Sequence, residues 1–158
     1  MHHFASLNNL YSFVRACLLH HQPPINARYH YGLRKPVVCA INGAAAGVGL
    51  VLACYCDVRF AADTAVLTTA HGRLNLPAEY GLSWVLPRMI GLARAADMLL
   101  TSRRVTANEA ERMGLVNYVV PAAELLSRTV AYAATMARDI RCAPAQHNLL
   151  GLARVPRS

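Results

Sequence analysis

The sequence predicts an α/β fold in one domain. Short apolar runs of strand length alternate with longer runs of helical period, and neither an internal repeat nor a linker separates them. With 158 residues, the chain is long enough to bury a substantial core. Its content of 55% hydrophobic and 15% charged residues excludes a disordered chain.

The first predicted unit covers residues 35–57. Pro36 favours an extended entry into a β-branched strand at residues 37–41, and a loop of small residues follows at 44–49. The apolar run at residues 50–56 is predicted to be a helix. A strand, a glycine loop and a helix in this order bring free backbone N–H groups together, which suits either a developing oxyanion or a phosphate.

The remaining elements follow in chain order. Residues 70–81 show no regular period and have the length of a functional loop. Thr106 and Glu109 have capping-box spacing at the start of a helix, and Gly114 is predicted to end that helix. Pro87 is predicted to kink its helix. The predicted strands are 58–61, 65–69 and 115–120, and the predicted helices are 82–86, 92–100, 107–113 and 122 to about 137.

The composition limits the partners and the compartment. The net charge of +8 comes from 15 arginines and one lysine spread along the chain, without a basic stripe of interleaved aromatic residues, so no nucleic-acid partner is predicted. Five cysteines, an odd number, indicate free thiols in a reducing compartment, and no N-terminal secretory signal is evident. A cytoplasmic location is therefore predicted. Cys54 and Cys56 lack metal-ligand spacing, and no metal site is predicted.

One uncharged run, residues 36–56, is long enough to cross a membrane. It begins with β-branched residues, and Asn42, Gly43, Gly47 and Gly49 interrupt it. We therefore predict no membrane span.

Several motifs occur in the same order in a known family. They include a Lys-Pro-Val strand that ends in Asn-Gly, a Gly-Val-Gly loop, a Cys-Asp-Val-Arg-Phe-Ala strand and a Leu-Pro-Arg-Met-Ile-Gly segment. With Ala-Asn-Glu-Ala and Gly-Leu-Val-Asn, the motifs lie at residues 35–43, 47–49, 56–61, 86–91, 107–110 and 114–117. On these residues the chain resembles the enoyl-CoA hydratase/isomerase (crotonase) superfamily, from roughly residue 28 to residue 137. The glycine loop is neither a dinucleotide fingerprint nor a phosphate loop, so the oxyanion remains as the predicted ligand of this loop.

The resemblance implies a crotonase-like spiral of ββα units with a C-terminal helical region, of which the chain is a C-terminal portion with the first part missing. It divides the chain into a poorly matching segment (1–34), a ββα core (35–121) and a C-terminal helix with an unpatterned tail (122–158). The implied substrates are acyl-CoA thioesters. Coenzyme A is part of the substrate, so no separate cofactor is implied, and the implied assembly is a homotrimer or hexamer.

In this family two backbone N–H groups hold the thioester oxygen while it becomes an enolate. Matching the motif position by position assigns the second of these donors to the N–H of Val48. The implied substrate-contacting residues around it are Gly47, Gly49, Ala44 and Ala46. The motif that carries the first donor lies upstream in the family and is absent from residues 1–34. A catalytically inactive fragment with a structural or oligomerising role is therefore the alternative.

Hydratases of the family use two glutamates, whose positions match Val51 and His71. The resemblance implies His71 among the substrate-binding residues, and an imidazole can also transfer protons; local packing or capping is the alternative role for His71. Residues 76–81 resemble the segment that carries the single glutamate of Δ3,Δ2-enoyl-CoA isomerases. The resemblance implies Glu79 as acid/base, the alternative being a contact with the dipole of the next helix, and it implies Trp84 in the substrate pocket. The predicted function is isomerisation or hydration of enoyl-CoA thioesters through an enolate, with one glutamate.

Overall fold

The computed structural model describes residues 36–78 and 80–139. The predictions for residues 1–34, for Glu79 and for the tail beyond residue 139 lie outside the described residues. The helices described are α2 (Val48–Cys54), α3 (Leu82–Ile90), α4 (Leu92–Thr101), α5 (Ala107–Met113) and α6 (Leu125–Asp139), with short 3-10 turns η3 (Gly72–Leu74) and η4 (Ala122–Glu124). The strands described are β1 (Val38–Ile41), β2 (Ala44–Ala46), β3 (Val58–Ala62), β4 (Val66–Thr68), β5 (Val105–Thr106) and β6 (Tyr118–Val120).

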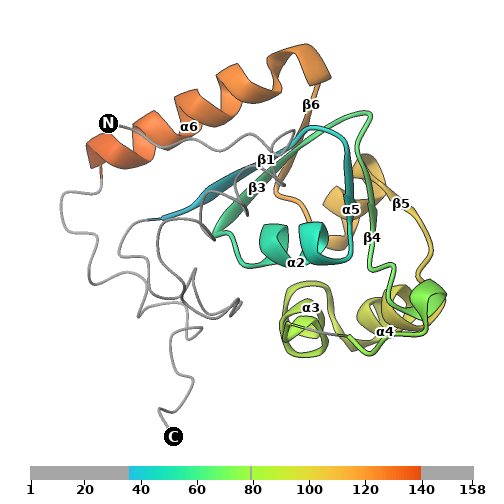
Figure 1. Ribbon diagram of the computed structural model, residues 1–158. Helices are drawn as coiled ribbons and strands as arrows, with labels where there is room; N and C mark the ends of the chain where they lie inside the picture. Colours follow the sequence, from blue (N-terminus) through green and yellow to red (C-terminus); the bar gives the residue numbers. More distant parts are fainter. Residues whose placement is uncertain (1–35, 79, 140–158) are drawn as a thin grey trace, which may run out of the picture.

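These strands form two small sheets. One has the order β1-β3-β6 and is parallel throughout. In the other, of order β2-β4-β5, β2 and β4 are parallel and β5 is antiparallel to β4. Figure 1 shows β1 and β3 between α6 above and α2 below. Each pair of successive strands is followed by a helix, in the orders β1–β2–α2 and β3–β4–α3, so the predicted α/β class and its ββα units are confirmed.

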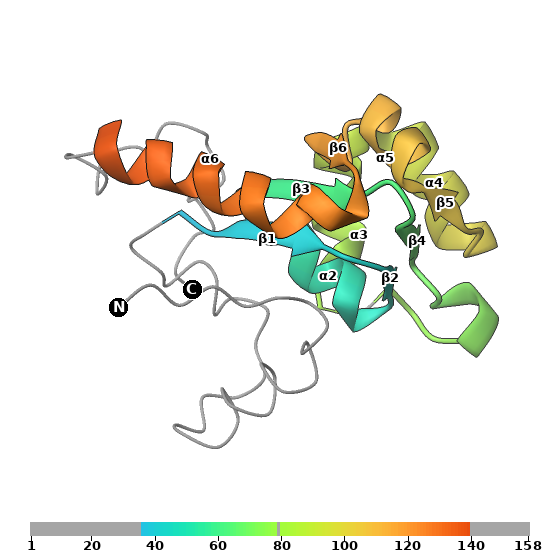
Figure 2. The ribbon, with the colours of Figure 1, turned by 90° about the horizontal axis from the view of Figure 1, so that it is seen from above.

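Aliphatic side chains from several elements fill one core. The largest fully buried ones are Ile41, Leu50, Leu67, Leu82, Leu86, Met98 and Leu115. On the opposite face of the β1-β3-β6 sheet, α6 crosses β1 and β3 (Figure 2). Tyr132 of α6 packs edge-on against Phe60, with the two ring centroids 5.3 Å apart. The ring centroids of Tyr118 and Phe60 are 4.7 Å apart. Such aromatic contacts add roughly 0.5–1.5 kcal/mol each to the burial of their area, so α6 is anchored through this cluster.

Arg59, on β3, ties the end of α2 to the residues before β6. Its side chain is buried, and its Nε donates to the carbonyl of Leu115 at 2.8 Å. Its Nη1 donates to the carbonyls of Ala53 and Cys56 at the C-terminal end of α2. The Ala53 carbonyl also accepts from the N–H of Cys56 at 3.1 Å, and the C-terminal end of the helix dipole favours positive charge. One buried guanidinium thus fixes α2 relative to β3.

Several boundaries differ from the predicted ones. Residues 44–46, expected as loop, form β2, because β4 pairs with three alanines that have little strand propensity of their own. Helix α2 begins at Val48 rather than at residue 50. Helix α3 continues through Pro87 to its end. The proline cannot donate to the carbonyl of Ser83, but Ser83 is exposed, so water can hydrogen-bond to that carbonyl.

Only one of the two hydrogen bonds of the predicted capping box of α5 is formed. The Oγ1 of Thr106 accepts from the N–H of Glu109 at 3.3 Å, whereas the Glu109 carboxylate pairs with Arg103 at 2.8 Å. Gly114 ends the helix with φ 82, as predicted. The N–H of Leu115 then bonds back to α5 at 2.8 Å, so the strand predicted from residue 115 is reduced to β6.

Buried cysteines in the described part of the chain are free thiols, as predicted. Cys39 and Cys54 lie in the core, and burial raises the pKa of Cys54 to about 12. Cys56 is half-buried, and a hydrogen bond from Cys39 lowers the pKa of the Cys56 thiol. The uncharged run at residues 36–56 is divided among β1, β2 and α2. Among the helices described, none has the length and apolar character needed to cross a bilayer.

Replacing Arg59 by Met is expected to lower the free energy of unfolding by about 3 kcal/mol, because buried carbonyls that lose a charged donor cost roughly 1–3 kcal/mol each. Urea unfolding followed by circular dichroism measures this. Arg88→Met, at an exposed arginine of α3, is the control and should cost less than about 1 kcal/mol. Equal costs for the two variants would contradict the anchoring role of Arg59.

Candidate active site

The candidate site lies where β2 and β4 end together. The two strands are parallel, with Ala46 opposite Thr68, and the N–H of Gly47 donates to the carbonyl of Thr68 at 3.2 Å. Because parallel strands present their carboxyl ends at the same edge of a sheet, the segments that follow them are neighbours. The start of α2 and the segment that carries His71 are therefore brought together.

Val48 is the first residue of α2 and is 42% exposed. The N–H groups of a first helical turn have no partner inside the helix, and no acceptor in the described part of the chain contacts that of Val48. Gly47 precedes it with φ 51 and ψ −121, a conformation that glycine adopts without steric cost. The N–H of Val48 is thus open to a ligand, and its predicted oxyanion role stays a prediction.

Strand β2 presents small side chains beside this N–H. Ala44 and Ala46 are exposed, whereas Ala45 between them is buried. Gly49 is buried within α2. The structure therefore places the small residues predicted to contact substrate next to Val48, on one strand and the turn of helix that follows it.

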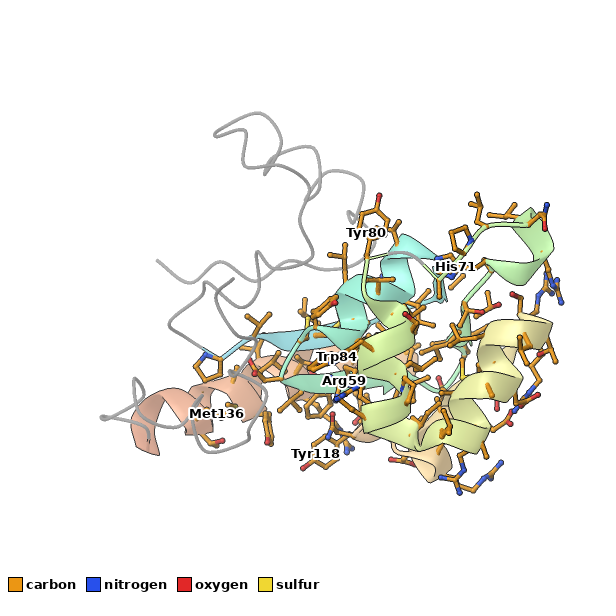
Figure 3. The ribbon with its side chains drawn as sticks, turned by 90° about the horizontal axis from the view of Figure 1, so that it is seen from below. Arg59, His71, Tyr80, Trp84, Tyr118 and Met136 are labelled. Atoms are coloured by element: carbon orange, nitrogen blue, oxygen red, sulfur yellow. The ribbon has the colours of Figure 1, made fainter. Side chains whose placement is uncertain are left out.

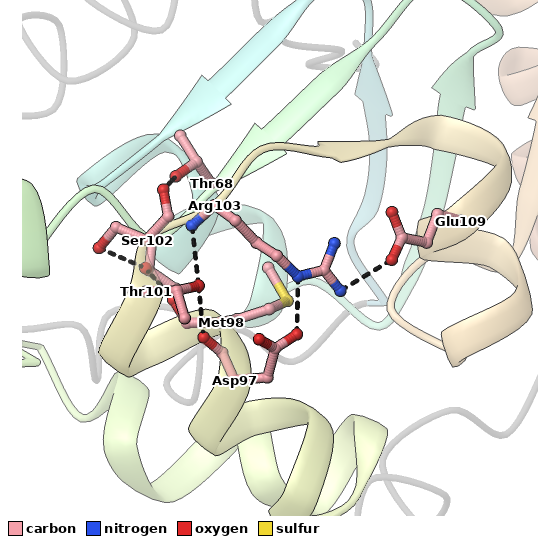
Figure 4. A network of polar contacts seen from close by, with 8 residues as sticks. Thr68, Asp97, Met98, Thr101, Ser102, Arg103 and Glu109 are labelled. Atoms are coloured by element: carbon pink, nitrogen blue, oxygen red, sulfur yellow. Dashed lines mark hydrogen bonds and ion pairs between the residues drawn. The ribbon is translucent and has the colours of Figure 1, made fainter.

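Hydroxyl groups hold the backbone on both sides of His71. The Oγ of Ser102, just after α4, accepts from the N–H of Gly72 at 2.8 Å. The Oγ1 of Thr68 accepts from the N–H of Ala70 at 3.3 Å and donates to the carbonyl of Ser102 at 2.9 Å. Figure 4 shows the hydrogen bond from Thr68 to Ser102 at the end of α4. The position of His71 is therefore set by a helix end some thirty residues further along the chain.

The same segment is tightly packed and partly strained. Ala70 has φ 61, in the left-handed region that costs an alanine roughly 1–2 kcal/mol. A Cβ on Gly72 would lie 3.0 Å from the Oγ of Ser102 and 3.1 Å from the carbonyl oxygen of Leu100. Only glycine fits this approach without a shift of α4. Strain of this kind persists where the surrounding contacts over-determine the backbone.

The imidazole of His71 is buried, with 5% of the residue exposed, and its Nδ1 has no hydrogen-bond partner among the described residues. His71 is the N-cap residue of η3, yet its side chain makes no capping hydrogen bond. The capping alternative is therefore wrong, whereas the ring does pack. Leaving a buried polar atom unpaired costs about 1–3 kcal/mol, and each such group calls for an explanation.

The turn that follows Glu79 is held by Tyr55, at the end of α2. The Tyr55 hydroxyl donates to the carbonyl of Tyr80 at 2.7 Å. Tyr80 and Gly81 are both left-handed, with φ 53 and 73, and a Cβ on Gly81 would lie 2.6 Å from that hydroxyl. Glu79 itself is not among the described residues, so its catalytic role stays a prediction.

Val51 and Trp84 are two further positions that the family resemblance singled out; the first is buried and the second is exposed. Val51 is 1% exposed, so the position that a glutamate occupies in hydratases is part of the core here. Trp84 is 37% exposed on α3, and the guanidinium of Arg88 lies 4.0 Å from its ring centroid. Figure 3 shows Trp84 away from His71, and its place in a substrate pocket stays a prediction. No group of three His, Cys, Asp or Glu side chains that suits a metal ion occurs in the described part of the chain.

Sequence patterns missed the residues that support the site. Ser102, Thr68 and Tyr55 make their contacts across 25 to 34 positions of the chain. A hydroxyl at the end of an element has no periodicity, so nothing local identifies its partner.

Comparisons with known proteins agree with this architecture. A family model described as "Enoyl-CoA hydratase/isomerase" matches residues 26–148. A probable enoyl-CoA hydratase of Mycobacterium tuberculosis is 48% identical over 106 residues, which are 66% of this chain and 37% of that protein. A probable enoyl-CoA hydratase of Rhodobacter capsulatus is 42% identical over 118 residues, 75% of this chain and 45% of that protein. The chain thus spans less than half the length of these relatives.

Solved structures extend the likeness to three dimensions. An enoyl-CoA hydratase from Mycobacterium tuberculosis superposes with a TM-score of 0.73 at 36% identity, covering 82% of this chain and 58% of that one. A monofunctional enoyl-CoA isomerase from Mycobacterium smegmatis superposes with a TM-score of 0.65 at 46% identity, and the match covers 70% of this chain and 52% of that one.

Replacing Gly81 by Ala is expected to destabilise the protein by about 3 kcal/mol, since left-handed strain of roughly 1–2 kcal/mol adds to displacement of the Tyr55 ring. Urea unfolding measures the loss. Gly114→Ala is a matched control, because Gly114 has nearly the same conformation (φ 82, ψ 10) and its Cβ would meet nothing closer than 3.7 Å. Gly114→Ala should therefore lower the free energy of unfolding only by the left-handed strain of roughly 1–2 kcal/mol.

A Tyr55→Phe background separates the two contributions. Without the hydroxyl, Gly81→Ala should cost no more than Gly114→Ala does. If the two glycine variants already cost the same in the wild-type background, the close contact with Tyr55 does not constrain this turn.

Proposed function

The chain belongs to the enoyl-CoA hydratase/isomerase family, and we propose that it acts on enoyl-CoA thioesters by stabilising an enolate. The observation that carries the proposal is the open first-turn N–H of Val48, beside the joined ends of β2 and β4. A backbone N–H at a helix start stabilises an oxygen on which negative charge develops. The carbonyl oxygen of a thioester becomes such an oxygen when the C2 proton is lost.

Glu79 is the proposed acid/base, and isomerisation is the reaction that one carboxylate supports most directly. The carboxylate takes a proton from C2 of a 3-enoyl-CoA, and the electrons of that bond pass to the carbonyl oxygen. The dienolate is held at the N–H of Val48. The carboxylic acid then returns the proton to C4, which yields the 2-enoyl-CoA.

Names of similar proteins support both chemistries of the family. The relatives from Mycobacterium tuberculosis and Rhodobacter capsulatus are named probable hydratases, and the similar structure from Mycobacterium smegmatis is named a monofunctional isomerase. Each reaction passes through an enolate at the same thioester. An acyl-CoA is therefore the proposed partner of this chain, and a homotrimer or hexamer is its proposed assembly.

Val48→Pro tests the oxyanion donor, because proline removes the N–H and is tolerated as the first residue of a helix. Gly47, with ψ −121, is not in the α conformation that a following proline disfavours. We expect kcat for 3-hexenoyl-CoA to fall about 10²–10³-fold. The isomerisation is followed by the absorbance of the conjugated product.

Val48→Ala is the matched control, since it shortens the side chain and keeps the N–H. Its kcat should stay within a few-fold of the wild-type value. Equal losses in the two variants would show that the side chain of Val48, rather than its N–H, is what the reaction uses.

Glu79→Gln should lower kcat for 3-hexenoyl-CoA by about 10²–10⁴-fold while the dissociation constant for hexanoyl-CoA changes little, because an amide cannot exchange the proton. Kinetics and isothermal titration calorimetry measure the two quantities. Glu124→Gln, at an exposed glutamate of η4, is the control. Unchanged turnover in Glu79→Gln would remove Glu79 from the mechanism.

The wild-type chain itself decides between the proposal and its alternative. A chain that sediments as a trimer yet neither binds hexanoyl-CoA nor turns over 3-hexenoyl-CoA would favour an inactive oligomerising fragment.

A further inference from the structure

Two thiols meet at the opposite end of α2 from the candidate site. Cys39 lies on β1, and Cys56 follows the last residue of α2 by two positions. The N–H groups of Asp57 and Val58 both donate to the carbonyl of Val37, at 2.9 and 3.4 Å. The chain that leaves α2 is therefore bonded back to the residue that precedes β1, and Cys56 comes beside that strand.

The thiol of Cys39 lies on the face of the sheet that α2 covers. Neighbouring side chains on a strand point to opposite faces. On β3, Phe60 contacts Tyr132 of α6. Its neighbour Arg59 points the other way and donates to carbonyls at and beyond the end of α2. Cys39 is paired with Arg59 in the register of β1 and β3, so the two side chains share a face.

The two sulfur atoms are joined by a hydrogen bond. The thiol of Cys39 donates to the sulfur of Cys56, which in turn donates to the carbonyl of Leu52 at 3.3 Å. A disulfide needs two sulfurs that approach to about 2.05 Å from side chains directed toward each other. Sulfurs that already share a hydrogen bond meet the second condition, and the first needs only an adjustment of the two side chains.

The surroundings give the two sulfurs different roles. Cys39 is buried, whereas Cys56 is partly exposed. The hydrogen bond from Cys39 lowers the pKa of the Cys56 thiol against the effect of its partial burial. The guanidinium of Arg59 also lowers that pKa, and the carboxylate of Asp57 opposes it. Because thiolate character and exposure decide which thiol reacts with a peroxide, Cys56 is the thiol that reacts first.

Cys54, the last residue of α2, is an internal reference for an unreactive thiol. It is buried, and burial raises its pKa to about 12. A free cysteine of this kind acts as a small apolar side chain. Cys54 and Cys56 are only two positions apart, so a difference in their reactivity reflects the local structure rather than the region of the chain.

We propose that Cys56 and Cys39 form an oxidation site, at which a small hydroperoxide such as hydrogen peroxide oxidises Cys56 and Cys39 then closes a reversible disulfide. The proposal is independent of the enoyl-CoA chemistry, because neither thiol takes part in that reaction. The disulfide would link β1 covalently to the segment that follows α2.

The reaction has two steps. The Cys56 thiolate attacks one oxygen of hydrogen peroxide, the O–O bond breaks, and the leaving hydroxide takes up a proton to become water. Cys56 is then a sulfenic acid. The sulfur of Cys39 loses its proton and attacks the Cys56 sulfur, the S–O bond breaks, and the sulfenic oxygen leaves as a second water. The two thiols lose two electrons in total, and the peroxide gains them.

The first test uses the unmodified chain. The folded chain is treated with an equimolar amount of hydrogen peroxide, and the remaining thiols are alkylated. Chymotrypsin then cleaves after Tyr55 and so separates Cys54 from Cys56. We expect the peptide of Cys39 linked to the peptide of Cys56, about 2 Da lighter than the sum of the two reduced peptides, because two hydrogen atoms are lost. Dithiothreitol should restore both thiols, and Cys54 should be recovered alkylated.

Variants separate the two roles. In Cys39→Ala the sulfenic acid of Cys56 has no neighbouring thiol, so dimedone should label Cys56 at least about ten-fold more than Cys54. Cys54→Ala is the matched control, which keeps both members of the pair and should form the disulfide within a few-fold of the wild-type rate. Circular dichroism checks that each variant is folded.

Several outcomes would overturn the proposal. They are a wild-type chain that keeps both thiols under peroxide, a disulfide from Cys56 to any cysteine other than Cys39, and a folded Cys54→Ala variant that no longer forms the bond. The same treatment in concentrated urea tests the contribution of the fold. The preference for the pair should disappear there, and an equal yield of the Cys39–Cys56 disulfide in the unfolded chain would show that the structure does not create the site.

Discussion

The parallel pairing of β2 with β4 is the constraint on which the candidate site depends. Three alanines have little tendency to form a strand, so β2 exists through its partner. The pairing continues into the hydrogen bond from Gly47 to Thr68, which brings the start of α2 beside the segment of His71. The proposed oxyanion donor, the N–H of Val48, and the buried ring of His71 therefore follow two strands whose ends are hydrogen-bonded, although 23 positions separate these residues in the chain.

Most of the costly backbone conformations in the described part of the chain lie between β4 and α3. Ala70 and Tyr80 adopt left-handed backbone conformations, and the Nδ1 of His71 is buried without a partner in the described part of the chain. Elsewhere in the described residues, Arg59 donates to carbonyls at and just beyond the end of α2, and aromatic rings anchor α6. A core of large aliphatic residues offsets the local strain. Strain that persists at one place is expected where geometry serves a ligand.

The relation to the family is clear in fold and less direct in chemistry. Two-glutamate hydratases need a carboxylate at the position of Val51, which is core here. In the proposed function, proton transfer is therefore assigned to a residue outside α2, Glu79. The chain also spans less than half of relatives such as the Rhodobacter capsulatus protein.

The sequence by itself determined the α/β class, the order of the main elements and the glycine loop at the start of α2, because apolar period and glycine position act locally. It also determined the end of α5 at Gly114, where a left-handed residue is required. Only the tertiary structure decided that residues 44–46 pair as β2, that Tyr55 holds the turn at Tyr80, and that the capping alternative for His71 is wrong. Those outcomes depend on partners 22 to 30 positions away, and pairing at such distances has no signature in a local pattern of residues.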